Sequence, residues 1–134
     1  MIVVETNVIA HLWLPGDETE VSERLLARDP AWASPVLWRS EFRSVLGGWI
    51  RRGRLDLARA ERIAADAEDL LAGREFLVPS AAVLRRVAGS GCSAYDCEFV
   101  VLAERLGVPL VTRDREILSA FPAVSRHPEA FLAS

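Results

Sequence analysis

Four acidic residues stand where a lone carboxylate is costly, and they are Glu5, Glu41, Asp96 and Asp114. Glu5 directly follows the apolar run Ile2–Val4, and Asp114 lies two residues past an apolar run that ends at Thr112. An isolated buried charge is strongly destabilising unless something neutralises it, and four such charges also repel one another. A divalent cation is the simplest group that makes such a cluster tolerable. Because Mg²⁺ prefers oxygen ligands, the four acids predict a metal site.

The apolar runs and helical periods alternate along the chain. Strands are expected at Ile2–Val4, Ala31–Ala33, Phe76–Pro79 and Pro109–Thr112, with a last edge strand at Ala123–Ser125. Helices are expected at Val8–Leu14, Thr19–Arg28, Val36–Arg51, Leu55–Leu71, Ser80–Ala88, Ala94–Leu106 and Asp114–Ala120. Ser80 and Ser93 are the expected N-caps of two of these helices. Strands separated by helices predict an α/β fold whose parallel sheet has helices on both faces.

This arrangement would bring the four acids together. Ligands of open parallel sheets bind beyond the carboxyl ends of the strands, where Glu5 and Asp114 are expected. Glu41 lies at the edge of a helical stripe formed by Trp38, Phe42, Val45 and Trp49. Asp96 shares a helical face with Phe99, Val100 and Ala103. Both helical acids should therefore point toward the sheet.

Each acid also has a simpler interpretation. Asp114 is a natural N-cap for the helix that follows it. Asp96 stands three residues after Ser93, which suggests an imperfect capping box. Glu41 can be a half-exposed surface residue, whereas an acid directly after a buried strand, as at Glu5, is uncommon. One shared site explains all four positions more simply than four coincidences.

The bulk properties predict a single domain that spans residues 1–134. The chain is 51 % hydrophobic and 26 % charged, as expected of a globular protein. We expect a cytoplasmic protein without membrane contact, because the sequence has neither a signal peptide nor an apolar run of about 18 residues. Cys92 and Cys97 match no metal or redox pattern and predict reduced thiols. His11 and His127 are isolated, which favours structural or exposed roles.

The net charge of −3 becomes +1 without the four acids, and all 16 basic residues are arginine. Arginine is a planar donor suited to phosphate. The densest group is Arg51, Arg52 and Arg54, and Arg85–Arg86 is a smaller one. These groups are either solvated helix ends or contacts for RNA or an acidic partner. Arg113 and Arg115 flank Asp114 and are the best placed to contact RNA.

The ordered set of motifs resembles that of PIN domains. The motifs are Val3–Ile9, Glu41 on the third helix, Ser93–Asp96 and Val111–Asp114. They are most similar to those of VapC-type toxins of type II toxin–antitoxin modules, and the resemblance covers the whole chain. It implies a three-layer α/β/α sandwich with a parallel sheet of four to five strands in the order 3-2-1-4-5. It also implies a Mg²⁺- or Mn²⁺-dependent ribonuclease, usually a homodimer, that a cognate antitoxin inhibits.

The expected site residues follow from the acids and this resemblance. Glu5, Asp96 and Asp114 are the expected metal ligands, and Glu41 would help to hold the metal or orient the attacking water. Thr112 and Asn7, and more weakly Thr6, are expected to hydrogen-bond to a ligand acid or to water. The exposed part of the Trp38, Phe42 and Trp49 stripe would be the place for an antitoxin helix or a dimer contact.

One residue departs from the family pattern. Glu5 stands where the family has Asp, and the longer side chain moves its carboxylate outward by about one bond, roughly 1.5 Å. The alternative function is therefore a weakened PIN-like module that acts mainly by binding antitoxin or RNA. A phosphatase of the acid–metal class is disfavoured, because position 7 is Asn7 rather than a second Asp and the chain contains no lysine.

Overall fold

A computed structural model describes residues 1–134 and contains one five-stranded sheet. The strands are β1 (Ile2–Val4), β2 (Trp32–Pro35), β3 (Glu75–Phe76), β4 (Leu110–Val111) and β5 (Ser125–Arg126). They pair in parallel in the order β3-β2-β1-β4-β5. This confirms both the α/β class and the expected strand order 3-2-1-4-5.

The central strand β1 explains the uninterrupted apolar run at the N-terminus. Val3 pairs with Ala33 of β2 on one side and with Leu110 of β4 on the other. Val3 and Val4 are completely buried, because helices cover both faces of the sheet at this point. Strands on both sides and helices on both faces thus hold β1 in place, and they also fix the backbone position of Glu5, which follows it.

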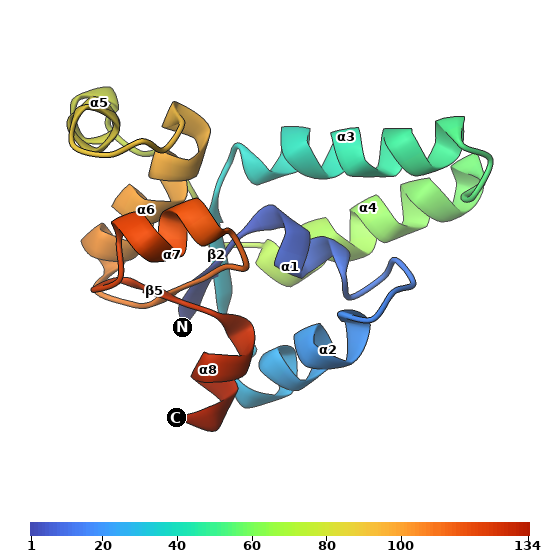
Figure 1. Ribbon diagram of the computed structural model, residues 1–134. Helices are drawn as coiled ribbons and strands as arrows, with labels where there is room; N and C mark the ends of the chain where they lie inside the picture. The colour runs from blue at the N-terminus through green and yellow to red at the C-terminus, as the bar shows by residue number, and fades with distance from the viewer.

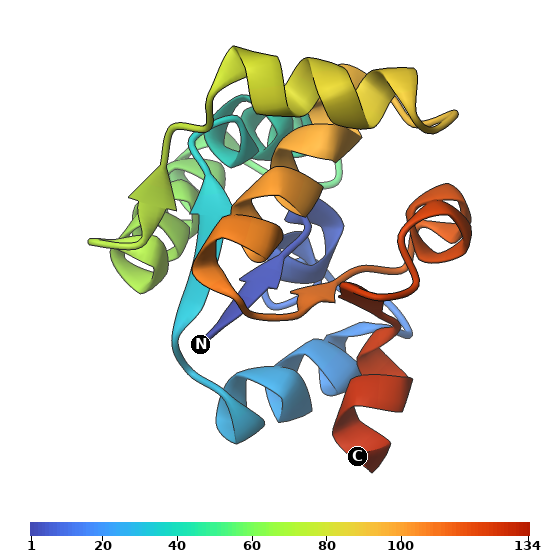
Figure 2. The same cartoon turned by 90° about the vertical axis from the view of Figure 1, so that its left-hand side faces the viewer.

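Eight helices connect and flank the strands. They are α1 (Thr6–Ala10), α2 (Thr19–Arg28), α3 (Trp38–Arg51), α4 (Leu57–Leu71), α5 (Ser80–Ala88), α6 (Ala94–Leu106), α7 (Arg115–Ala120) and α8 (Pro128–Ala133). Helices α3 and α4 form a long hairpin that extends to one side of the molecule, and α2 lies beside α8 (Figure 1). Helix α6 crosses the strands and packs against β1, β2 and β4 (Figure 2). None of the helices combines the length and the apolar character needed to cross a membrane.

The core is one cluster of 27 buried hydrophobic residues. Helix α6 contributes the continuous run Phe99–Ala103, all of it buried. A helix that is apolar over most of its circumference belongs between other elements, which agrees with its position across the sheet. The first residues of α6, including Asp96, are thereby held at the edge of the core.

Several element boundaries differ from those expected. The first helix begins at Thr6 rather than Val8, because the side chain of Glu5 caps it, and it ends at Ala10 rather than Leu14. Beyond Ala10 the chain continues in tight turns, with Leu12 N bonded to Ile9 O. The third helix begins at Trp38, because Val36 N still bonds to Phe76 O at the end of the sheet.

The sheet strands and the fourth helix also shift at their ends. The second strand is Trp32–Pro35 rather than Ala31–Ala33, and the third is Glu75–Phe76 rather than Phe76–Pro79. The fourth strand is Leu110–Val111 rather than Pro109–Thr112, and the fifth is Ser125–Arg126 rather than Ala123–Ser125. Helix α4 begins at Leu57 because Asp56 is its N-cap and accepts a hydrogen bond from Arg59 N.

The predicted caps had mixed outcomes. Ser93 is the N-cap of α6, and its Oγ accepts a hydrogen bond from Asp96 N at 3.1 Å, as expected. The prediction for Ser80 was wrong: Pro79 occupies the N-cap position, and no side chain caps this helix. Helix α8 was not expected at all. Its start is marked by His127, which accepts a bond from Glu129 N, and by Pro128 in the first turn.

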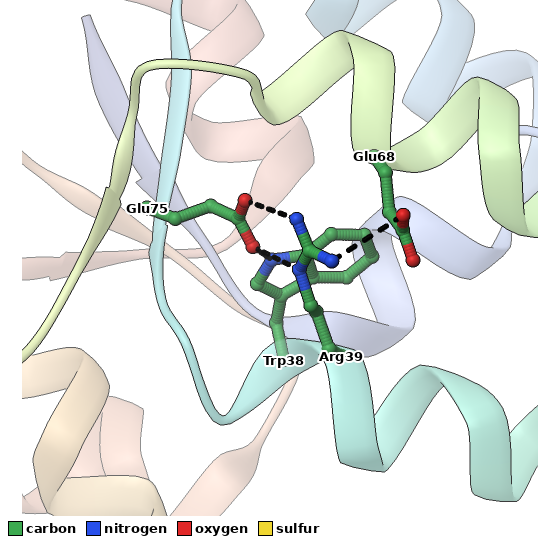
Figure 3. A network of polar contacts seen from close by, with 4 residues as sticks. All are labelled: Trp38, Arg39, Glu68 and Glu75. Atoms are coloured by element: carbon green, nitrogen blue, oxygen red, sulfur yellow. Dashed lines mark hydrogen bonds and ion pairs between the residues drawn. The ribbon is translucent and has the colours of Figure 1, made fainter.

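A polar network fixes the start of α3 to the edge of the sheet (Figure 3). Arg39 donates from Nε and Nη2 to the two carboxylate oxygens of Glu75, each at 2.7 Å. Trp38 Nε1 donates to the same carboxylate at 2.7 Å, and Glu68 of α4 lies 3.3 Å from Arg39 Nη1. The network sets the position of the first turn of α3, which carries Glu41.

Candidate functional site

Glu5 is placed at the carboxyl end of the central strand. Its backbone N–H bonds to Val111 O at 3.1 Å, which ties it to the neighbouring strand β4. Its carboxylate caps α1 by accepting a hydrogen bond from Asn7 N at 3.3 Å. Burial, together with the charges of the three other acids, raises the pKa of Glu5 to about 7. The negative charges of Glu41, Asp114 and Asp96 that contribute to this rise would also attract a cation.

Glu41 faces the same region from the first turn of α3. The hydroxyl of Thr6 donates to Glu41 Oε1 at 2.6 Å, so α1 and α3 are joined beside Glu5. Burial raises the pKa of Glu41, the hydrogen bond from Thr6 opposes this, and the charge of Asp96 raises the pKa further. Thr6 is itself buried, which fixes the donor.

Asp96 and Asp114 complete the group. Burial raises the pKa of Asp96, and the charge of Asp114 acts in the same direction. Asp114 is the N-cap of α7: its Oδ1 accepts hydrogen bonds from Glu116 N at 2.8 Å and Ile117 N at 3.0 Å. The capping interpretation is therefore correct, but it does not exclude a site. Asp114 Oδ2 has no hydrogen bond within the protein and remains available to a ligand.

The four acids thus form one electrostatic cluster. Each of the raised pKa values, at Glu5, Glu41 and Asp96, is raised in part by another acid of the group, and no arginine acts on any of them. The donor set consists of oxygens, as hard divalent cations require. The side chains as they stand do not form a group of three ready to hold a metal ion. The residues therefore fit a cation in chemistry and charge, and they would have to close around it.

The comparison with known families decides the family. The PIN domain family model matches residues 2–123, which is most of the chain. The chain belongs to the PIN domain family. A curated relative, Ribonuclease VapC3 of Pyrobaculum aerophilum, is 28 % identical over 128 residues, covering 92 % of this chain and 96 % of that protein.

Solved PIN-like structures have the same fold. The crystal structure of PAE2754 from Pyrobaculum aerophilum has a TM-score of 0.77 at 24 % identity, covering 98 % of this chain and 93 % of the other. FitAcB from Neisseria gonorrhoeae gives a TM-score of 0.71 at 22 % identity, with 96 % and 99 % covered. A toxin–antitoxin complex from Klebsiella pneumoniae gives 0.69 at 16 % identity, with 96 % and 98 % covered.

The three residues expected to hydrogen-bond to the acids, Thr6, Asn7 and Thr112, differ in how they contact the acids of this PIN domain. Thr6, the weakest candidate in the sequence, makes the shortest contact, with Glu41. The hydroxyl of Thr112 accepts a hydrogen bond from Asp114 N at 3.0 Å and so orients the backbone of that acid. Asn7 contacts Glu5 through its backbone N–H, while its exposed side chain has no hydrogen bond within the protein.

Two further acids near the cluster were not expected from the sequence. Burial and the charge of Glu41 raise the pKa of Glu98, which lies on α6 two residues after Asp96. The charge of Glu116 acts on Asp96. No motif marks either residue, because each approaches the cluster only through the packing of α6 and α7. The negative region of this PIN domain therefore extends beyond the four acids.

The two arginines that flank Asp114 have different surroundings. Arg113 forms an ion pair with Glu18 at the start of α2, and its Nη1 lies 3.5 Å from His127 Nε2. It therefore does not present a free guanidinium to a substrate, which departs from the expected RNA contact. Arg115 is exposed and lines a cavity of about 430 Å³ together with Cys92 and Glu116. Both cysteines are free thiols, as expected.

The aromatic stripe of α3 is divided between the core and the surface. Trp38 and Phe42 are buried, whereas Trp49 lines a cavity of about 560 Å³ with Trp13 of the turn after α1. Arg54 stacks over the Trp49 ring at 5.1 Å, and Arg59 also lines this cavity. The cavity combines aromatic surface with two arginines and one acid, Asp56.

Proposed function

We propose that this PIN domain is the metal-dependent endoribonuclease toxin of a toxin–antitoxin module. The observation that carries the proposal is the cluster of Glu5, Glu41, Asp96 and Asp114 at the carboxyl ends of β1 and β4. Burial, and then the charges of neighbouring acids, raise the pKa values of Glu5, Glu41 and Asp96, and no cationic side chain offsets this rise. A relative named as a VapC ribonuclease supports the choice of RNA as substrate.

The site residues would have the following roles. Glu5, Asp96 and Asp114 would hold Mg²⁺ or Mn²⁺, and Glu41 would bind it or orient the attacking water. When bound, the ion activates a water and neutralises the negative charge that develops on the scissile phosphate. Thr6 keeps one oxygen of Glu41 fixed, and Thr112 keeps the Asp114 backbone fixed.

Substrate contact would involve the surface beside Asp114. Arg115 is exposed next to this acid and is the arginine best placed to contact an RNA phosphate. Attack by water would leave a 5′-phosphate and a 3′-hydroxyl on the products.

The partner would be a cognate antitoxin. The cavity lined by Trp13, Trp49, Arg54 and Arg59 fits a segment with an acidic and an aromatic or aliphatic side chain. The structural neighbour from Klebsiella pneumoniae is a toxin–antitoxin complex, which supports a partner of this kind. The homodimer, the single domain over residues 1–134 and the cytoplasmic location stay predictions.

A catalytically weakened module is the alternative function. Two observations favour it: Glu5 already serves as the cap of α1, and the acids are not arranged to hold an ion as they stand. In that case the chain would act mainly by binding antitoxin or RNA.

The substitution Asp96→Asn tests the proposal. It removes one charge while keeping the side-chain shape, so RNA cleavage in Mg²⁺ or Mn²⁺ should fall by at least about 100-fold, and the thermal midpoint should stay within a few degrees. Cleavage of a labelled RNA, end-group analysis of its products and circular dichroism are the measurements. Full cleavage by the folded variant would disprove the assignment.

A further inference from the structure

Arg113 has an unusual position for an arginine next to a cluster of acids. It lies between Thr112 and Asp114, yet its side chain is mostly buried, at 21 % exposure, and pairs with Glu18. None of the pKa values of Glu5, Glu41 and Asp96 shows an effect of its charge. Of the two arginines that flank Asp114, Arg113 thus has its positive charge paired with Glu18 rather than with the cluster.

The guanidinium is held by charge rather than by aligned hydrogen bonds. Its Nε is buried without a hydrogen-bond partner, and Nη2 lies against the Glu18 carboxylate without hydrogen-bond alignment. Nη1 faces His127 Nε2 at 3.5 Å. A buried donor without a partner is unfavourable, so this guanidinium has little besides the Glu18 charge to keep it in place.

The acids are within the same neighbourhood. The charges of Arg113 and Glu18 both act on His11, which caps the C-terminal end of α1. Glu5 caps the N-terminal end of this five-residue helix, and a helix of that length spans only about 7 Å. If Glu18 lost its charge, Arg113 would still be the sequence neighbour of Asp114, one of the four acids, and its guanidinium would be free to turn toward that acid.

We propose that Glu18 is a positioning residue for the acid cluster: it holds the Arg113 guanidinium away from Asp114 and Glu5, so that an internal cation does not occupy carboxylates that a divalent ion would bind. The inference rests on the proposed function for the metal site. It assigns to the α1–α2 connection a role in keeping the site open, which no motif indicates.

Titration calorimetry of the whole protein with Mn²⁺ tests the inference through three variants. Glu18→Gln should weaken Mn²⁺ binding by about tenfold, since a freed guanidinium near the acids competes with the ion. The double variant Glu18→Gln with Arg113→Gln should return to within about twofold of the wild-type affinity, because the competing charge is gone. In the metal-free Glu18→Gln protein, the Nε–H resonance of Arg113 should shift as it gains an acid partner.

Glu104→Gln is the matched control. Glu104 pairs with Arg86 and has nearly the same side-chain exposure as Glu18, 35 % against 36 %, but it lies two turns along α6 from Asp96. Its replacement should leave Mn²⁺ affinity unchanged.

Two outcomes would overturn the inference: wild-type affinity in Glu18→Gln, or a double variant as weak as Glu18→Gln alone, which would mean that the pair only supports the loop. These outcomes are separable from a failure of the proposed function. If Mn²⁺ binding follows the expected pattern but RNA is not cleaved, the ribonuclease proposal fails and the role of Glu18 stands. If wild-type protein does not bind Mn²⁺, both fail.

Discussion

Glu5 combines two tasks that normally fall to different residues. It caps α1 through Asn7 N, and it is the most strongly perturbed acid of the cluster. The capping bond pulls its carboxylate toward the helix, whereas a shared ion would pull it toward Asp114 and Asp96. The extra methylene relative to Asp therefore bears directly on whether the site can close.

We predict that Glu5→Asp increases metal-dependent RNA cleavage. A carboxylate about one bond closer to the strand end should fit a shared ion better, and an error of about 1 Å at such a site can cost about 100-fold in rate. Single-turnover cleavage in Mn²⁺ is the measurement. Glu41→Asp is the control, because shortening the acid that Thr6 already holds should lower the rate. An unchanged rate in Glu5→Asp would contradict the weakened-module alternative.

Thr6 should control the charge state of Glu41. Replacing Thr6 by Val keeps the side-chain volume but removes the 2.6 Å hydrogen bond to Oε1, so the pKa of Glu41 should rise further. Carboxyl carbon NMR titration of the metal-free protein measures this directly. Thr6→Ser, which keeps the hydroxyl, should preserve the wild-type titration. If Val and Ser behave alike, the hydroxyl does not set the pKa of Glu41.

At the scale of elements, the first turn of α3 depends on Glu75. This residue of β3 receives both guanidinium bonds of Arg39 and the indole bond of Trp38, and these hydrogen bonds lower its pKa (Figure 3). Glu75→Gln should destabilise the protein by about 1–3 kcal/mol, as expected when a charged hydrogen-bond partner is lost. Urea unfolding at pH 7 is the measurement. The control is Glu104→Gln, which removes the more exposed ion pair between Glu104 and Arg86 and should cost at most about 1 kcal/mol.

The sign of the pH dependence follows from the lowered pKa of Glu75. The stability that this carboxylate contributes is present above its unfolded value of 4.5 and is lost as the pH falls below that value. The difference between wild type and Glu75→Gln should therefore shrink in acid. A difference that persists at pH 3 would mean that the ion pair is not its source.

The elements show which parts of this fold a single sequence can predict. The strand order followed from the resemblance, and the apolar runs located the strands approximately, although only β1 has the expected bounds. The boundaries were wrong where one particular hydrogen bond decides them: the side chain of Glu5 caps α1 and starts it early, and the backbone N–H of Val36 stays bonded to Phe76 O and delays α3. The pairing of Glu18 with Arg113 could not be predicted, because it joins segments that are distant in sequence and share no motif.

At the scale of the whole molecule, the acid cluster stabilises the metal-free folded state more in mild acid than at neutral pH. The folded pKa of Glu5, about 7, lies above its ordinary value of 4.5, so the folded state holds this proton more tightly than the unfolded chain. Folding stability should therefore fall as the pH rises from about 4.5 to about 7, by at most about 3 kcal/mol, and stay level above that range. The raised pKa values of Glu41 and Asp96 act in the same direction.

Binding of a divalent ion should reverse this loss, because the ion favours the ionised acids that the empty cluster resists. We expect Mn²⁺ at about 100 times its dissociation constant to add about 2.7 kcal/mol to the stability of the folded state. At a fixed Mn²⁺ concentration, the rise in thermal midpoint should be larger at pH 8 than at pH 6, since Glu5 no longer has to lose a proton for the ion to bind. Thermal unfolding with Mn²⁺ or with a chelator measures both effects.

In Glu5→Gln the pH-dependent loss of stability of the metal-free protein should be reduced, and in Asp96→Asn the stabilisation by Mn²⁺ should be weaker. Equal Mn²⁺ effects at both pH values, or in all three proteins, would mean that the ion binds elsewhere and that the four acids do not form its site.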